Sequence, residues 1–185
     1  MSSVRIRGIA LASVFAALTA ITAGGIPIFV TPVPVTLQVF FVFLALSLAG
    51  PWYGGLSMLI YLFLGALGLP IFAGYTGGLV KLLGPTGGYI FGFPLAAFFG
   101  GLVAGKKKPE RKRELIFVLA GMLVAISITY GLGVIWLSNY LGRNYFEGFL
   151  LGALPFLPAD FVKMIIAIPI ALRLRSEIRS LPITP

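Results

Sequence analysis

Residues 149–172 read FLLGALPFLPADFVKMIIAIPIAL, and Asp160 and Lys163 are the only ionisable residues in this apolar run. An ionised side chain at bilayer depth is costly unless a partner compensates its charge. Because residues three apart share one face of a helix, the two opposite charges can lie side by side. The stretch therefore predicts a membrane helix whose charged face points to an enclosed site. That site holds either a ligand or a structural ion pair that fastens a bundle.

The rest of the chain is similarly apolar. Of its 185 residues, 59% are hydrophobic and only 10% are charged, whereas soluble domains carry about 25% charged residues. The composition predicts an all-α integral membrane protein embedded in the lipid bilayer. It leaves room for a single transmembrane domain over residues 1–185 and for no separate soluble domain.

The inventory of reactive side chains is small. Cysteine and histidine are absent, and only five residues are acidic. This excludes disulfides and thiolate or imidazole metal sites. It also excludes the usual nucleophile–base pairs of catalysis. We therefore expect neither an enzyme nor a metal or cofactor site.

Six apolar segments are candidate membrane spans, although a full crossing takes about 20 residues and two of the segments are short. They are Gly8–Ala23, Val35–Ala49, Trp52–Leu67, Gly87–Ala104, Leu115–Leu141 and Gly148–Leu172. Basic residues cluster before the first segment, between the fourth and fifth, and after the sixth. Since positive residues stay on the cytoplasmic side, six spans place both termini and the 106–113 loop in the cytoplasm. The net charge of +9 then reflects membrane orientation and not a nucleic-acid partner.

The connections on the predicted outer side are unusual. Residues 24–34 hold three prolines among apolar residues, which fits either a lid packed onto the bundle or a rigid turn at the headgroups. Further along, Tyr-Thr-Gly-Gly at 75–78 recurs as Pro-Thr-Gly-Gly at 85–88. Paired glycines permit backbone conformations that other residues avoid, and non-helical backbone at membrane depth is tolerated where it lines a cavity. We expect these turns to offer N–H groups and a hydroxyl to a small polar ligand. The residues concerned are Gly77, Gly78, Thr86, Gly87 and Gly88.

Two prolines predict a break in the sixth segment. Pro155 and Pro158 precede Asp160, and proline fits the first turn of a helix. Asp160 then lies in the first turn after the break, where unpaired N–H groups and the positive end of the helix dipole favour a carboxylate. At about 1.5 Å per residue, Lys163 lies roughly 15 Å from Arg173 at the inner end. Both charges therefore belong to the outer half of the membrane.

Three further polar side chains stand out in the apolar segments or beside them: Thr36, Gln38 and Tyr89. A polar group buried in hydrocarbon must find a hydrogen bond. For Gln38, we expect that bond to go either to a neighbouring helix or to a ligand.

Small side chains form a strip along one face of the first segment, at Ala12, Ala16 and Ala20. Such strips let another helix approach closely. The spacing alone leaves open whether that helix belongs to this bundle or to a partner subunit.

Four motifs resemble the BioY family, the biotin-specific substrate-binding (S) components of energy-coupling factor (ECF) transporters. They are VPVTLQ at 33–38, GLPIFAG at 68–74, LGPTGGYIFGF at 83–93 and PADFVK at 158–163. The similarity extends over nearly the whole chain. It is least diagnostic after Arg173 and in the 106–113 loop.

The resemblance implies a six-helix bundle in the cytoplasmic membrane of a bacterium or archaeon, with an outward-facing biotin pocket beneath a lid. It implies that Asp160 and Lys163 contact biotin, and that Lys163 donates to either the ureido carbonyl or the carboxylate. Further expected contacts are Gln38, Gly77, Gly78, Thr86, Gly87, Gly88 and Tyr89. The resemblance also implies docking onto a transmembrane scaffold subunit that carries two ATPases, with Ala12, Ala16 and Ala20 at the contact.

Two other functions stay open at this stage. S components for other small vitamins share the architecture, so thiamine or riboflavin could replace biotin as the ligand. A structural membrane protein, stabilised by its buried ion pair, is the alternative from another class.

Overall fold

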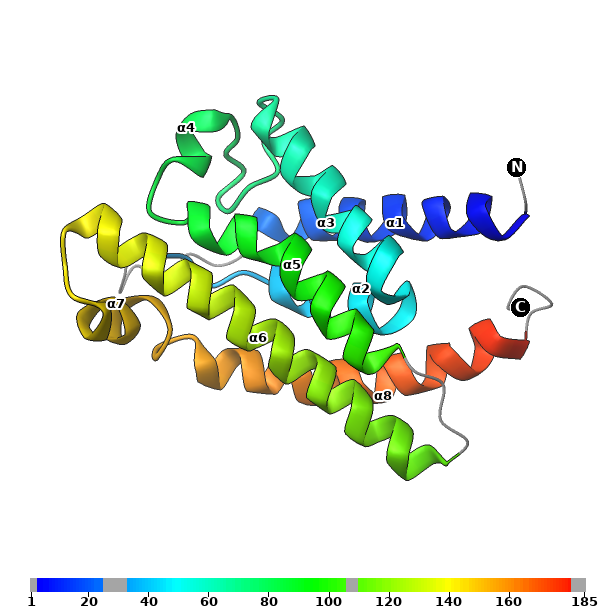
Figure 1. Ribbon diagram of the computed structural model, residues 1–185. Helices are drawn as coiled ribbons and strands as arrows, with labels where there is room; N and C mark the ends of the chain where they lie inside the picture. Colours follow the sequence, from blue (N-terminus) through cyan, green and yellow to red (C-terminus); the bar gives the residue numbers. More distant parts are fainter. Residues whose placement is uncertain (1–2, 25–32, 106–109, 181–185) are drawn as a thin grey trace.

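The computed structural model describes residues 3–24, 33–105 and 110–180, and every regular element among them is helical. Figure 1 shows the helices as an elongated bundle. In chain order they are α1 (Ser3–Ile21), η1 (Thr22–Gly24), α2 (Gln38–Leu48), α3 (Gly50–Ala66), α4 (Leu79–Leu82), α5 (Gly87–Ala104), α6 (Arg111–Leu141), α7 (Tyr145–Gly152) and α8 (Leu157–Ser180). The predicted all-α class is confirmed.

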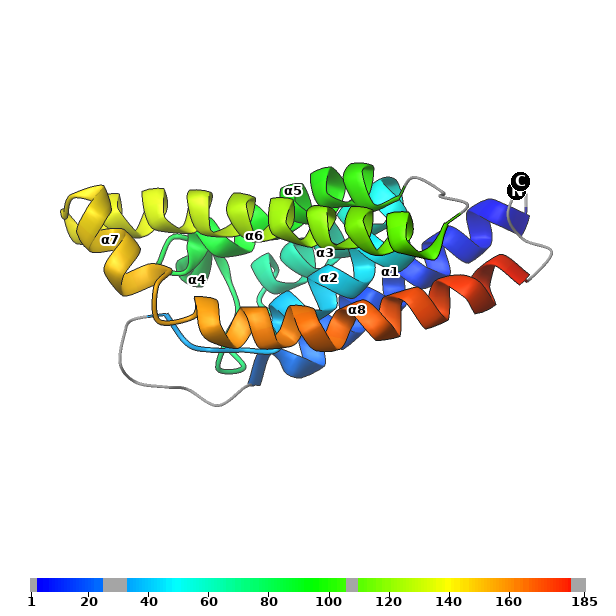
Figure 2. The same ribbon diagram turned by 90° about the horizontal axis from the view of Figure 1, so that it is seen from below.

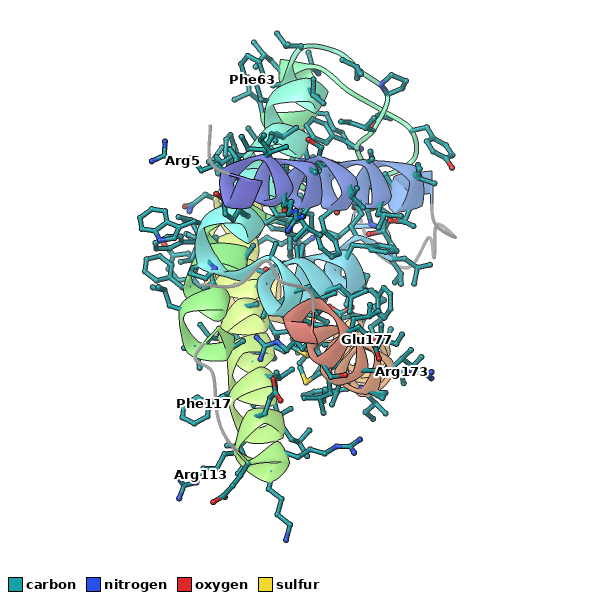
Figure 3. All side chains as sticks on the ribbon, turned by 90° about the vertical axis from the view of Figure 1, so that its right-hand side faces the viewer. Arg5, Phe63, Arg113, Phe117, Arg173 and Glu177 are labelled. Carbon is teal, nitrogen blue, oxygen red and sulfur yellow. The ribbon has the colours of Figure 1, made fainter. Side chains whose placement is uncertain are left out.

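The basic segments gather at one end of the bundle. The start of α1, the start of α6 and the end of α8 all lie at the right-hand end of Figure 1, while α4 and α7 lie at the opposite end. Figure 2 shows α8 running along the bundle between these two ends. In Figure 3, which looks onto the basic end, Arg113 and Arg173 project away from the helices. Residues 106–109 of the predicted inner loop lie outside the described residues.

Helix lengths support only part of the predicted six spans. In the described part of the chain, three helical stretches are long and apolar enough to cross a membrane, and the bent pair of α7 and α8 brings the number to four. The other two predicted segments are helical but short, with 11 residues in α2 and 17 in α3. The α2 helix begins at Gln38 and not at Val35, and the backbone N–H of Gln38 donates to the Thr36 hydroxyl oxygen at 3.3 Å.

The chain breaks at two places: at Gly50-Pro51, where the sequence predicts a tight turn between the second and third segments, and within the sixth segment. Gly50 adopts a φ of +73°, which suits glycine, and the chain turns there from α2 into α3. The sixth segment divides into α7 and α8, which meet at an angle of 54°. Asp160 lies in the first turn of α8, as predicted.

The α5 and α6 helices approach closely where neither carries a side chain. A Cβ added to Gly121 of α6 would lie 2.5 Å from the carbonyl oxygen of Gly100 on α5, and 2.6 Å from the Cβ of Ala104. Backbone atoms form this contact, so it has no flexible side chain that could yield. The core that the bundle encloses includes the fully buried Phe43, Tyr61 and Phe72.

We expect Gly121→Ala to lower the free energy of unfolding by about 1–3 kcal/mol, because it overpacks this contact. Gly131→Ala is the matched control on the same helix, since nothing lies within 4 Å of a Cβ there. That substitution should leave stability unchanged or raise it by about 0.5–1 kcal/mol. Thermal unfolding in detergent measures both, and an equal effect of the two substitutions would contradict the close packing.

Candidate functional site

A cavity opens among α2, α5, α6 and α8, near the end of the bundle opposite the basic residues. It encloses about 560 Å³ of empty space, its open mouth included. Half of the lining residues are apolar, among them Val39, Ile90, Phe93 and Phe156. The other half carry polar groups that converge on the cavity, and polar groups set in an apolar lining are typical of a small-molecule site. These polar residues are Thr36, Gln38, Thr86, Tyr89, Thr129, Tyr130, Asp160 and Lys163.

Asp160 and Lys163 form a buried ion pair at this cavity. Their relative exposures are 2% and 8%. The Lys163 Nζ donates to Asp160 Oδ1 at 2.6 Å, and the Tyr130 hydroxyl donates to Asp160 Oδ2 at 2.7 Å. Both oxygens of the carboxylate are therefore bonded, each with further lone pairs, and the ammonium group carries three protons. The pair can accept from and donate to a guest without giving up its internal bonds.

Gln38 lies at the start of α2 and is held from two sides. Its Nε2 donates to the hydroxyl of Tyr61 on α3, and its Oε1 accepts from the Thr36 hydroxyl at 2.9 Å. Gln38 thus bonds to a neighbouring helix, which is one of the two alternatives expected from the sequence. Its side chain also lines the cavity. The fixed amide presents a defined polar edge there.

Thr86 contributes a buried hydroxyl without a visible partner to this site. Its relative exposure is 5%, and within the described part of the chain its Oγ1 makes no hydrogen bond. A buried hydroxyl without a bond is costly, and buried polar atoms are otherwise nearly always bonded. Because Thr86 lines the cavity, a guest molecule can supply the missing bond.

Tyr89 fixes one wall of the cavity. Its hydroxyl donates to the carbonyl of Gly152, the last residue of α7, at 2.8 Å. Its ring meets the ring of Tyr130 edge-on, with centroids 6.1 Å apart. The predicted ligand residue is therefore present at the cavity, held by α6 and α7.

Comparison with known proteins agrees with this geometry. A family model described as the BioY family matches residues 1–180. This chain belongs to the BioY family. It is 46% identical over 169 residues to a probable biotin transporter BioY of Pyrococcus horikoshii, covering 91% of this chain and 96% of that protein. It is 44% identical over 164 residues to the biotin transporter BioY of Thermotoga maritima, covering 89% and 93%.

A solved structure shares the fold of this BioY-family chain. The crystal structure of the S-component for biotin from an ECF-type ABC transporter matches with a TM-score of 0.83 and 31% identity, over 95% of both chains. The family resemblance predicted from the four sequence motifs is confirmed.

The glycines at the start of α5 do not line the cavity. A Cβ on Gly87 would lie 1.8 Å from the carbonyl oxygen of Leu82, and one on Gly88 would lie 2.6 Å from that of Leu132. The Gly87 N–H already donates to the carbonyl of Gly84 at 3.1 Å. These two glycines permit close backbone packing against the α4 turn and against α6. The N–H groups expected to bond a ligand therefore do not line this cavity.

Gly77 and Gly78 also lie outside the cavity lining. A Cβ on Gly77 would lie 2.2 Å from the carbonyl oxygen of Leu69. Gly78 has a φ of +87°, and its N–H donates to the carbonyl of Gly65 at 2.7 Å. Conformation and packing account for both glycines.

The alanine strip of α1 faces the bundle and not its surroundings. Ala12 and Ala16 are 0% and 4% exposed, and Ala20 packs half-buried against the core. They share this face with the buried Phe15 and Thr19, because residues three and four apart lie together on a helix. Ala12 and Ala16 therefore pack inside this bundle, and the contact with a partner subunit predicted for the strip stays a prediction.

The predicted lid falls mostly on residues 25–32, which lie outside the described residues. Its last two residues, Val33 and Pro34, line the cavity. Sequence reasoning missed Tyr130 and Tyr61, which bond to Asp160 and Gln38. Both were detectable, because each is a phenol in an apolar segment and must find a partner.

Removing one member of the buried ion pair should cost far more stability than removing both. We expect Lys163→Met to lower the free energy of unfolding by about 3–5 kcal/mol, since it leaves the Asp160 carboxylate without its counter-ion. The double variant Asp160→Asn with Lys163→Met should lose less free energy of unfolding than the single variant Lys163→Met. Thermal unfolding in detergent provides the measurement.

The exposed pair of Arg143 and Glu147, 3.3 Å apart, is the control. Arg143→Met should change stability by less than about 1 kcal/mol. A single Lys163 variant as stable as the double variant would contradict a charged, tightly paired site.

Proposed function

We propose that this chain captures biotin in the cavity and serves as the substrate-specific subunit of an ECF-type transporter. The observation that carries the proposal is the buried group of Asp160, Lys163 and Tyr130, which faces an apolar cavity in a BioY-family fold. Relatives over nearly the full length of the chain are named biotin transporters. The structural neighbour is named an S-component for biotin.

The chemistry of the cavity suits the chemistry of biotin. The ureido ring of biotin carries two N–H donors and one carbonyl acceptor, and its carboxylate ends a flexible apolar chain. Asp160 can accept from a ureido N–H, while Lys163 can donate to the carbonyl or to the carboxylate. The Thr86 hydroxyl supplies one more polar contact. Aromatic and aliphatic residues such as Phe93, Phe156 and Val39 can hold the sulfur-containing ring.

The orientation in the membrane follows from the distribution of charge. Asp160 and Lys163 line the cavity near the start of α8, whereas the other end of α8 lies with the starts of α1 and α6 at the basic end of the bundle. Positive residues stay on the cytoplasmic side. The cavity then faces outward in the cytoplasmic membrane of a bacterium or archaeon. We include six spans and cytoplasmic termini in the proposal. The non-helical residues 33–36 line the cavity, and non-helical backbone in that position is tolerated at membrane depth.

Energy for uptake comes from partner subunits in this proposal. The sequence contains no GxxxxGK[ST] motif for binding nucleotide phosphates. A transmembrane scaffold subunit with two ATPases would supply that step. Because Ala12 and Ala16 are buried, docking onto the scaffold would use other surfaces unless α1 moves.

Titration of the purified chain with biotin, thiamine and riboflavin tests the proposal. We expect saturable binding of biotin, and no displacement of bound biotin by the other two vitamins. Saturable binding of thiamine or riboflavin in its place would assign the chain to another vitamin. A folded chain that binds none of the three would support the structural alternative and overturn the proposal.

Thr86→Val should weaken biotin binding by about tenfold, the value of one hydrogen bond of about 1–1.5 kcal/mol. It should leave the free protein as stable as before, because the hydroxyl makes no bond that the substitution breaks. Thr22→Val is the control, since that hydroxyl bonds to carbonyls of its own helix. Isothermal titration compares the two, and equal affinities would remove Thr86 from the binding site.

A further inference from the structure

Arg175 is buried although its sequence position suggests otherwise. It lies between Arg173 and Arg179 near the end of α8, in what reads as a cytoplasmic basic cluster. The neighbouring Arg173 projects away from the bundle in Figure 3. Arg175 is only 6% exposed. A buried guanidinium is costly unless several partners bond to it, so its partners define what it does.

Arg175 bonds to the ends of three other helices. Its Nε donates to the carbonyl of Ser47, near the end of α2, at 2.6 Å. A terminal Nη donates to the carbonyl of Ala104, the last residue of α5, at 2.6 Å. The other terminal Nη pairs with Glu114, in the first turn of α6, at 3.5 Å.

These partners are suited to a cation. The last carbonyls of a helix lack intrahelical partners and form the negative end of its dipole, and an acidic residue in a first turn is stabilised by the positive end. The guanidinium fork has several donors in fixed directions. One side chain therefore joins α8 to α2, α5 and α6 at the inner end of the bundle.

The same four helices build the cavity at the outer end. Gln38 comes from α2, Tyr89 from α5, Tyr130 from α6 and Asp160 from α8. Arg175 lies twelve residues beyond Lys163 on α8, which is ~18 Å along the axis. Figure 2 shows α8 running along the bundle between the two ends. Pro169 lies between the two residues, yet α8 continues as one helix from Leu157 to Ser180, so a shift of α8 at one end displaces the ion pair at the other.

We propose that Arg175 is a positioning residue for the ligand cavity. By fixing α8 against α2, α5 and α6, it sets the position of Asp160 and Lys163 relative to Tyr130 and Gln38. Stability alone does not explain a buried ion pair, because apolar residues of similar volume serve stability at least as well. The directed bonds of a guanidinium specify a geometry, and the geometry needed here is that of the cavity. The proposal rests on the proposed function, because its test measures biotin binding.

The test measures biotin affinity and dissociation rate in Arg175→Met, at a temperature well below its unfolding midpoint. We expect the affinity to fall by about tenfold or more, mainly through faster dissociation, because the ion pair is no longer held in position. Arg173→Met is the matched control and should bind within about twofold of the unmodified chain. Met122→Ala on α6 serves as a second control. It removes buried core volume and lowers stability, and Met122 is neither a bonding partner of Arg175 nor a residue of the cavity lining.

Two milder variants complete the design. Arg175→Lys keeps the charge but cannot reach three partners in fixed directions, so its affinity should fall between those of the unmodified chain and Arg175→Met. Glu114→Gln should weaken binding less than Arg175→Met does. If Arg175→Met does not fold, the biotin affinities of Arg175→Lys and Glu114→Gln test the positioning role.

Unchanged biotin affinity in the folded Arg175 and Glu114 variants would overturn the positioning role. So would an equal loss of affinity in Met122→Ala at the same loss of thermal stability, because that would make the effect a general one. If the unmodified chain itself binds no biotin, the proposed function fails instead. The two failures are thus distinguished within one set of titrations.

Discussion

The bonded group of Asp160, Lys163 and Tyr130 is the constraint on which the rest of the structure depends. A carboxylate and an ammonium group are retained among apolar side chains because each bonds to the other and the phenol bonds to the carboxylate. That arrangement needs α6 and α8 at a fixed separation. It also needs the helix to restart at Leu157, between Pro155 and Pro158, which brings Asp160 into the first turn of α8. The bend between α7 and α8 is therefore part of the site.

Close packing elsewhere keeps this arrangement in place. The α5 and α6 helices meet at Gly100 and Gly121, and again where Gly88 of α5 lies against the α6 backbone. Between these contacts, Tyr89 and Tyr130 meet edge-on at the cavity. Large side chains line the cavity, and glycines allow backbone contact on either side of this ring pair. The cavity thus lies beside a pair of helices that have little freedom to separate.

The sequence predicted the features that depend on strong local physics. Charged residues in hydrocarbon must pair, prolines break helices, and apolar segments become helices. The ion pair, the break before Asp160 and the all-α class were therefore all foreseeable. Features that depend on which neighbour a residue contacts were not foreseeable from the sequence. A pair of glycines is equally compatible with a ligand contact and with close backbone packing. In this structure, close packing or a positive φ accounts for Gly77, Gly78, Gly87 and Gly88. The same ambiguity affected Ala12 and Ala16. The sequence placed Arg175 in the basic cluster after the sixth segment, and it could not show its burial, which depends on the ends of three other helices.

The unbonded hydroxyl of Thr86 has a consequence for the empty protein. One buried polar atom is left unsatisfied whenever the cavity holds nothing that can bond to it. The folded chain is then more stable with a guest than without one, and by mass action the difference grows with the concentration of the guest. The thermal unfolding midpoint therefore rises with the concentration of the guest. Protein washed free of small molecules has the lowest midpoint.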